Sequence, residues 1–201
     1  MRIRRVIILI ITLLFSQATL AQRQPPSIRS VDFSNFKYPG SKGLFPTSEY
    51  ETQSFTLNKG KSKETPQQYG MTLMGINYGD ATGDGIAEAM IDLVVETEGT
   101  AVVNHVYIYT LRGGKPGFLW GFESGDRAEG GLKKVYAKAG QLVVELYGRG
   151  TQIEGDLNGT EATALCCPRS FTRTRYKWRG NRFRQQGRME ILTLPEKRGT
   201  T

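Results

Sequence analysis

Residues 78–97 read YGDATGDGIAEAMIDLVVET, a turn rich in side-chain oxygens that runs directly into an alternating segment. From Ala89 to Val95 the odd-numbered positions are apolar, whereas the even-numbered positions include the acids Glu88, Asp92 and Glu96. A period of two is that of a β-strand with one face on the core. We therefore expect a strand over residues 88–97, and we take the turn before it as the centre of the fold.

The turn has the ligand spacing of a loop that wraps a hard cation. Counted from Asp80, oxygen-bearing side chains occupy positions 1, 3, 5 and 9, and a glycine at position 6 lets the backbone turn sharply. These side chains are Asp80, Thr82, Asp84 and Glu88, and Ile86 offers a backbone carbonyl at position 7. Ile91 stands at position 12, where an EF-hand needs a bidentate glutamate, so that motif is excluded. The pattern predicts a Ca²⁺ site, with simple Asx turns at Asp80 and Asp84 as the alternative.

The rest of the chain favours strands joined by tight turns. It contains 24 glycines among 201 residues, and long apolar runs of helical period are nearly absent from the sequence. Hairpins are expected over residues 105–122 and 132–147, after a first strand at Val31–Phe36. We predict a single all-β domain over residues 31–194, with about nine or ten mostly antiparallel strands. Such a meander of hairpins forms an open barrel, a sandwich or a propeller-like sheet.

Residues 1–21 have the features of a cleavable signal peptide. Three arginines precede an apolar core, and a small-residue site ending at Ala21 predicts cleavage before Gln22. The predicted location is periplasmic or secreted, with no transmembrane segment in the mature chain. Cleavage removes three of the 27 Lys and Arg and none of the 19 Asp and Glu, so the formal charge falls from +8 to +5. We expect a flexible leader over residues 22–30 and a disordered tail over residues 195–201.

The C-terminal hairpin carries a row of cations on one face. Residues 170–178 alternate, and a two-residue turn at Gly180-Asn181 pairs Trp178 with Phe183 on the core side. The opposite face forms what we call the basic plate, which consists of Arg173, Arg175, Lys177, Arg179, Arg182 and Arg184. Like charges directly across a ladder destabilise it, so we expect negative charge to offset the plate.

Two sources of negative charge compete as the counterpart of the basic plate. One is external, an anionic envelope polymer or protein, and gives a polyanion-binding function. Nucleic acid is not favoured, because the aromatic side chains of the hairpin point away from the plate and are not placed to stack on bases. The other source is internal, the acidic row of Glu88, Asp92 and Glu96, provided that its strand lies close to the hairpin in one sheet.

Two further segments offer reactive side chains. Cys166 and Cys167 are the only two cysteines, and a disulfide between neighbours would be strained, because their Cα atoms lie only about 3.8 Å apart. A strained disulfide, a redox pair, a soft-metal site and two buried thiols all stay open. Asp126 and Glu129, with Arg127 between them, offer paired carboxylates for a hydrolase, although a solvent-exposed loop has the same composition.

The turn resembles the calcium loops of FG-GAP or VCBS-type repeats, with Thr82 in place of the usual Asp or Asn at the third position. The turn, the Cys-Cys-Pro sequence at residues 166–168 and the Tyr-Lys-Trp-Arg-Gly hairpin at residues 176–180 are together similar to the LppP/LprE group of exported bacterial lipoproteins. The resemblance covers roughly residues 69–183 and implies an exported protein, and it carries over no catalytic residues. No cysteine follows Ala21, so the lipid anchor of that group is not expected here.

The sequence therefore favours a secreted or periplasmic, non-enzymatic β module with a Ca²⁺-stabilised loop. Binding of a polyanion or of the cell envelope through the basic plate is the alternative. A hydrolase or redox protein built on Asp126/Glu129 or Cys166/Cys167 is the second alternative. The lone histidine, His105, falls in a predicted core strand, so the sequence brings no nucleophile, base and orienting group together.

Overall fold

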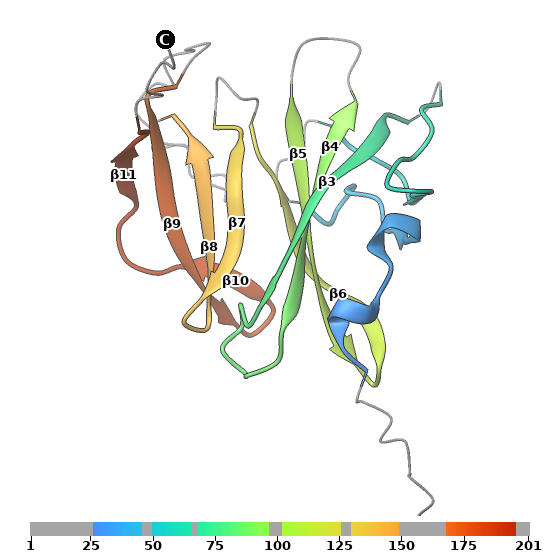
Figure 1. Cartoon of the computed structure of the whole chain (residues 1–201), viewed down its shortest axis with the longest axis horizontal. Coiled ribbons are helices and arrows are strands. Elements are labelled where there is room, and N and C mark those ends of the chain that lie inside the picture. Colours follow the sequence, from blue (N-terminus) through green and yellow to red (C-terminus); the bar gives the residue numbers. More distant parts are fainter. Residues whose placement is uncertain are drawn as a thin grey trace, which may run out of the picture.

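The structure is a computed structural model that describes residues 26–45, 50–65, 68–96, 102–125, 130–148 and 168–195. Within these ranges it contains eleven strands in three antiparallel sheets and no α-helix, which confirms the all-β prediction. Two short 3₁₀ helices and a two-stranded sheet form the N-terminal segment (Figure 1). Their bounds are η1 Ile28–Ser30, η2 Phe33–Asn35, β1 Lys37–Tyr38 and β2 Phe55–Thr56.

Two larger sheets make up the rest of the described chain (Figure 1). The first sheet has the order β3-β4-β5-β6, and the second has the order β10-β9-β8-β7, with β11 also paired to β9. The first sheet consists of β3 (Gly70–Gly79), β4 (Glu88–Glu96), β5 (Val103–Arg112) and β6 (Lys115–Glu123). The second consists of β7 (Leu132–Lys138), β8 (Gln141–Tyr147), β9 (Ser170–Arg179), β10 (Arg182–Gln185) and β11 (Glu190–Thr193). The hairpins expected from the sequence are present as β5–β6, β7–β8 and β9–β10.

The two larger sheets pack face to face as a sandwich. Ile108 of the first sheet and Val144 of the second lie in one buried apolar cluster between them. Trp120 of β6 meets Phe183 of β10 edge to face, with ring centroids 5.4 Å apart. The apolar face of the C-terminal hairpin therefore packs on the first sheet, as its alternating pattern predicts.

The first sheet is the middle one of three layers. Its other face is covered by the N-terminal segment, whose Phe33 and Tyr38 pack against Tyr109 of β5 with ring centroids 5.5 and 6.1 Å away. As a result β5 is buried on both faces from Val103 to Thr110. A strand in this position has no side that faces water, so an apolar residue is favoured at almost every position.

Because the first sheet is the middle layer, both faces of β4 are covered, whereas the sequence predicted one core face and one polar face. Its odd-numbered residues face the N-terminal layer, but Met90 on the other face is fully buried between the sheets, and the side chain of Glu88 is 0 % exposed. Because β4 and β9 belong to different sheets, Glu88, Asp92 and Glu96 do not form a row beside the basic plate. The prediction that these three acids neutralise the basic plate is therefore wrong.

The N-terminal segment also differs from the prediction. The strand expected over Val31–Phe36 is replaced by η2, because the Asp32 carboxylate accepts hydrogen bonds from Ser34 N at 3.1 Å and from Asn35 Nδ2 at 2.8 Å. These local bonds turn the backbone where the alternating pattern alone predicts extension. Ile28, within the expected flexible leader, is buried in η1, so the ordered fold begins earlier than the sequence indicates.

The C-terminal end of β3 stays paired with β4 and lies against β7 of the second sheet (Figure 1). A Cβ added at Gly79 would lie 2.8 Å from the Cβ of Ala137 in β7. In the loop that follows, a Cβ at Gly83 would lie 3.1 Å from the carbonyl oxygen of Gly140, and Gly83 has φ +84°. The two sheets therefore approach at this end to a distance that requires glycine.

Replacing Gly79 by alanine tests this approach. The new methyl group would overlap Ala137, so we expect Gly79→Ala to lower the free energy of unfolding by about 1–3 kcal/mol, measured by urea denaturation. Adding Ala137→Gly removes the opposing methyl group and should restore part of the loss. Gly75→Ala in the same strand is the control, because nothing lies within 4 Å of its added Cβ. Equal losses for the two alanine variants would contradict the close approach.

Candidate functional site

The loop over residues 80–88, which we call the acidic loop, is held together by its own carboxylates. The Asp80 carboxylate accepts hydrogen bonds from Gly83 N at 2.6 Å and Gly85 N at 3.0 Å. Asp84 Oδ1 accepts one from Ile86 N at 2.8 Å, two residues on, as in an Asx turn. Glycines at both positive-φ positions, Gly83 and Gly85, let the backbone amides converge on these oxygens.

Glu88 joins the acidic loop to the first sheet. Its Oε2 accepts hydrogen bonds from Ala81 N at 2.8 Å and Thr82 N at 3.3 Å, and its Oε1 accepts one from Thr110 Oγ1 at 3.2 Å. Burial raises the pKa of Glu88, and the hydrogen bonds from Ala81 and Thr110 oppose that rise. The side chain thus satisfies amides that would otherwise be buried without partners.

The three carboxylates are arranged as acceptors for loop amides. In the part of the chain that the structure describes, no group of three or more His, Cys, Asp and Glu side chains converges as a metal cluster would require. Thr82 nevertheless has a buried hydroxyl oxygen without a partner, at the third position of the predicted ligand set. Ca²⁺ binding by Asp80, Thr82, Asp84, Ile86 and Glu88 stays a prediction, and the Asx-turn alternative describes the observed bonds at Asp84.

A melting experiment tests the calcium prediction. If Ca²⁺ binds the acidic loop of the folded protein, it raises the melting temperature, and Asp84→Ala abolishes that rise because a ligand is lost. The measurement is thermal unfolding with added Ca²⁺ and with EDTA. Glu51→Ala, at an exposed acid outside the loop, is the control and should keep the full rise. A melting temperature that is the same with Ca²⁺ and with EDTA would contradict the prediction.

The basic plate lies on the outer face of β9 and β10, as the sequence predicts. Arg179 pairs with Arg182 and Lys177 pairs with Arg184 in the ladder, while Tyr176 on the opposite face is buried. The structure therefore confirms the predicted register and the predicted division of the hairpin into a basic and an apolar face.

Two of the six cations of the basic plate, Arg173 and Arg175, are neutralised by two acids that the sequence analysis missed. The Arg173 guanidinium lies 2.8 Å from Glu145 Oε1 of β8 and 3.5 Å from Glu190 Oε2 of β11. Glu190 also forms an ion pair with Arg175. Glu145 lies on the outer face of β8, directly opposite Arg173 in β9. A prediction of the β8–β9 register would therefore have identified Glu145 as the partner of Arg173.

The other four cations of the plate have no acidic partner among the described residues. Lys177, Arg179, Arg182 and Arg184 are all exposed, and no ion pair joins them to an acid within the described ranges. Their cross-strand neighbours in the β9–β10 ladder are one another. The positive charge is therefore concentrated near the β9–β10 turn rather than spread along the whole hairpin.

Glu145 makes the neutralised part of the plate sensitive to acid. Burial alone would raise the pKa of Glu145, but hydrogen bonds from Lys133 and Arg173 outweigh burial, and the pKa lies below its usual value of 4.5. A carboxyl whose pKa is lowered by folding stabilises the native state above its unfolded pKa, and that stabilisation is lost as the pH falls through the lowered pKa.

We therefore expect urea unfolding of the wild type to need less denaturant as the pH falls below about 4.5, the usual glutamate value. Glu145→Gln should be less stable at neutral pH and should lose less stability on acidification, since the titrating group is gone. Glu51→Gln removes an exposed acid paired with Lys42 and is the matched control. An acid dependence equally steep in Glu145→Gln and the wild type would show that this ion pair is not its source.

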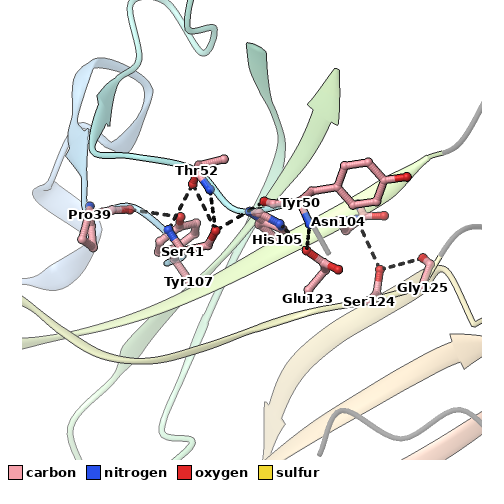
Figure 2. Close-up of polar contacts among 10 residues, drawn as sticks. All are labelled: Pro39, Ser41, Tyr50, Thr52, Asn104, His105, Tyr107, Glu123, Ser124 and Gly125. Carbon is pink, nitrogen blue, oxygen red and sulfur yellow. Dashed lines mark hydrogen bonds and ion pairs between the residues drawn. The ribbon is translucent and has the colours of Figure 1, made fainter. Parts of the chain in front are cut away.

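His105 lies in a buried polar network, not in an open site (Figure 2). Its side chain is 0 % exposed, and its Nε2 lies 2.8 Å from Glu123 Oε2, which also accepts a hydrogen bond from Tyr50 N at 3.3 Å. Ser41 and Thr52 exchange backbone-to-hydroxyl hydrogen bonds at 3.0 and 2.8 Å nearby. The network fastens Tyr50, and through it Ser41, to the β5–β6 hairpin, and His105 lies in a buried strand as the sequence predicts.

The remaining sequence-predicted side chains lie outside the described residues. These are Cys166 and Cys167 of the predicted redox or disulfide pair, and Asp126 and Glu129 of the predicted carboxylate pair. The hydrolase and redox alternatives therefore stay predictions.

Comparison of the chain with protein-family models, with curated proteins and with solved structures finds no match. The resemblance to the LppP/LprE group and to FG-GAP or VCBS-type loops accordingly stays a prediction. Among the described residues, none of the helices has the length and apolar character to cross a membrane.

Proposed function

We propose that the protein is an exported, non-enzymatic β module that binds an acidic polymer of the cell envelope. The binding surface is the unneutralised part of the basic plate, which consists of Lys177, Arg179, Arg182 and Arg184. The observation that carries the proposal is that these four exposed cations have no acidic partner in the described part of the chain, while Arg173 and Arg175 beside them are paired.

The geometry of the ladder supports an extended anion as the ligand. Directly opposed side chains in an antiparallel pair have Cβ atoms roughly 4.5–5.5 Å apart, so Arg179 and Arg182 repel each other across the strands, as do Lys177 and Arg184. An anion placed between two like charges relieves this repulsion. A polymer with regularly spaced negative groups relieves both pairs at once, whereas a single small anion relieves one.

The faces of the hairpin argue against nucleic acid as the polymer. Stacking of bases requires aromatic side chains on the binding face. The aromatic residues next to the four free cations lie on the opposite face, where Tyr176 is 2 % exposed and Phe183 is 0 % exposed. The plate therefore offers charge without base stacking, which fits a polymer recognised by its anionic groups alone.

Titration of the full mature chain with heparin, as a model acidic polymer, tests the proposal. Four cation contacts to a flexible polyanion predict a plot of log Kd against log salt concentration with a slope of about 3. Reversing the charge of Arg182 and Arg184 to glutamate should weaken binding at low salt by more than about tenfold and should reduce the slope.

A matched double variant controls for net charge. Lys37 and Lys115 are exposed and lie outside the second sheet, so Lys37→Glu with Lys115→Glu changes the formal charge equally and should alter the affinity by less than about twofold. Equal weakening by both double variants would show that only net charge matters. Tighter binding to duplex DNA than to heparin would contradict an envelope polymer as the ligand.

A further inference from the structure

A cleft opens between the acidic loop, the joined ends of β5 and β6, and Trp178 of β9. Its volume is ≈ 360 Å³, at the lower end of the roughly 300–1,000 Å³ found for small-molecule pockets. The side chains that matter for binding are Thr82, Asp84, Leu111, Arg112, Leu119 and Trp178. The cleft thus joins an aromatic surface from the second sheet to polar groups from the first.

One wall of the cleft is apolar. Trp178 is partly exposed, and its ring packs edge to face on buried Phe183, with centroids 4.9 Å apart and an interplanar angle of 64°. Leu111 and Leu119 extend this wall and are also partly exposed. An indole fixed in this way presents apolar surface to a ligand at little cost in side-chain entropy.

The other wall offers both hydrogen-bond donors and hydrogen-bond acceptors. Asp84 uses Oδ1 to accept the Ile86 N–H, and its Oδ2 has no partner among the described residues. Arg112 is exposed and makes no ion pair within the described chain. Thr82, also in the lining, has a buried hydroxyl oxygen without a hydrogen-bond partner. A ligand here meets free acceptors and free donors within one small volume.

The charges in the cleft argue against an ionic ligand. The cleft holds charges of both signs, the carboxylates of Asp84 and Glu88 and the Arg112 guanidinium, so an organic anion or cation that spans both walls would meet at least one like charge. An uncharged ligand with several hydroxyl groups uses the donors and acceptors without either penalty. A sugar ring also has an apolar face of C–H groups, which matches the indole of Trp178.

We propose that this cleft binds one uncharged sugar residue, stacked on Trp178 and hydrogen-bonded to Asp84 and Arg112. The site is separate from the polyanion surface, because Trp178 lies on the inner face of β9, whereas Lys177 and Arg179 lie on the outer face. The inference therefore does not depend on the function proposed above, and either one can fail alone.

The test is titration of the full mature chain with four uncharged probes: glucose, N-acetylglucosamine, cellobiose and N,N′-diacetylchitobiose. At least one probe should bind saturably by calorimetry and change the tryptophan emission. The chain has 2 tryptophans, and because Trp120 is only 8 % exposed, the change in emission reports on Trp178. Added NaCl should leave this affinity unchanged, because no net charge is neutralised.

Variants on the two walls locate the binding. Trp178→Leu should weaken binding by about tenfold, since the stacking surface is lost. Arg112→Ala should weaken it by at least about threefold, and because Arg112 is exposed, this variant decides the question even if Trp178→Leu does not fold. Lys177→Glu on the outer face is the control and should bind like the wild type.

Three results would overturn the proposal. Absence of binding for all four probes is the first, and unchanged affinity in Arg112→Ala is the second. The third is binding that falls steeply with salt or is lost in Lys177→Glu, which would assign the sugar to the basic plate instead.

Discussion

The close approach of the two larger sheets, where Gly79 meets Ala137 and Gly83 meets Gly140, is the constraint on which the acidic loop and the cleft beside it depend. The acidic loop takes part in this approach, because the Asp80 carboxylate accepts hydrogen bonds from Gly83 N and Gly85 N and so holds the loop with Gly83 against the β7–β8 turn. The carboxylates of the acidic loop thus accept hydrogen bonds from the protein's own backbone amides. The cleft beside Trp178 exists because this loop stands between the ends of the two sheets.

Much of the strand content was predictable, because a period of two survives in each hairpin and tight turns separate the strands. The register of β9–β10 followed from a two-residue turn at Gly180-Asn181 alone. The 3₁₀ turn at Phe33–Asn35 was not predictable from apolar pattern, because the Asp32 carboxylate competes for the backbone amides. Nor was the burial of Glu88, because local sequence does not show that a second layer covers the even-numbered face of β4.

The candidate site was predicted only in part, because local sequence shows the residues of one turn or hairpin but not their partners on distant strands. Local spacing identified the acidic loop and the basic plate, since each lies within one turn or one hairpin. Glu145 and Glu190 were missed because they reach Arg173 across pairings that the turn chemistry of one hairpin does not determine. These two acids decide which cations are free, so long-range pairing, more than composition, sets where the surface is positive.

The middle layer has a consequence for how the protein unfolds. Ile91 of β4 packs toward the N-terminal segment and Ile108 of β5 toward the second sheet, in adjacent strands of one sheet. Detachment of either outer layer would expose an apolar face of these same strands to water. Partial opening is therefore costly on both sides, and we expect the three layers to melt in a single cooperative transition, with the amides of β4 and β5 the slowest to exchange with solvent.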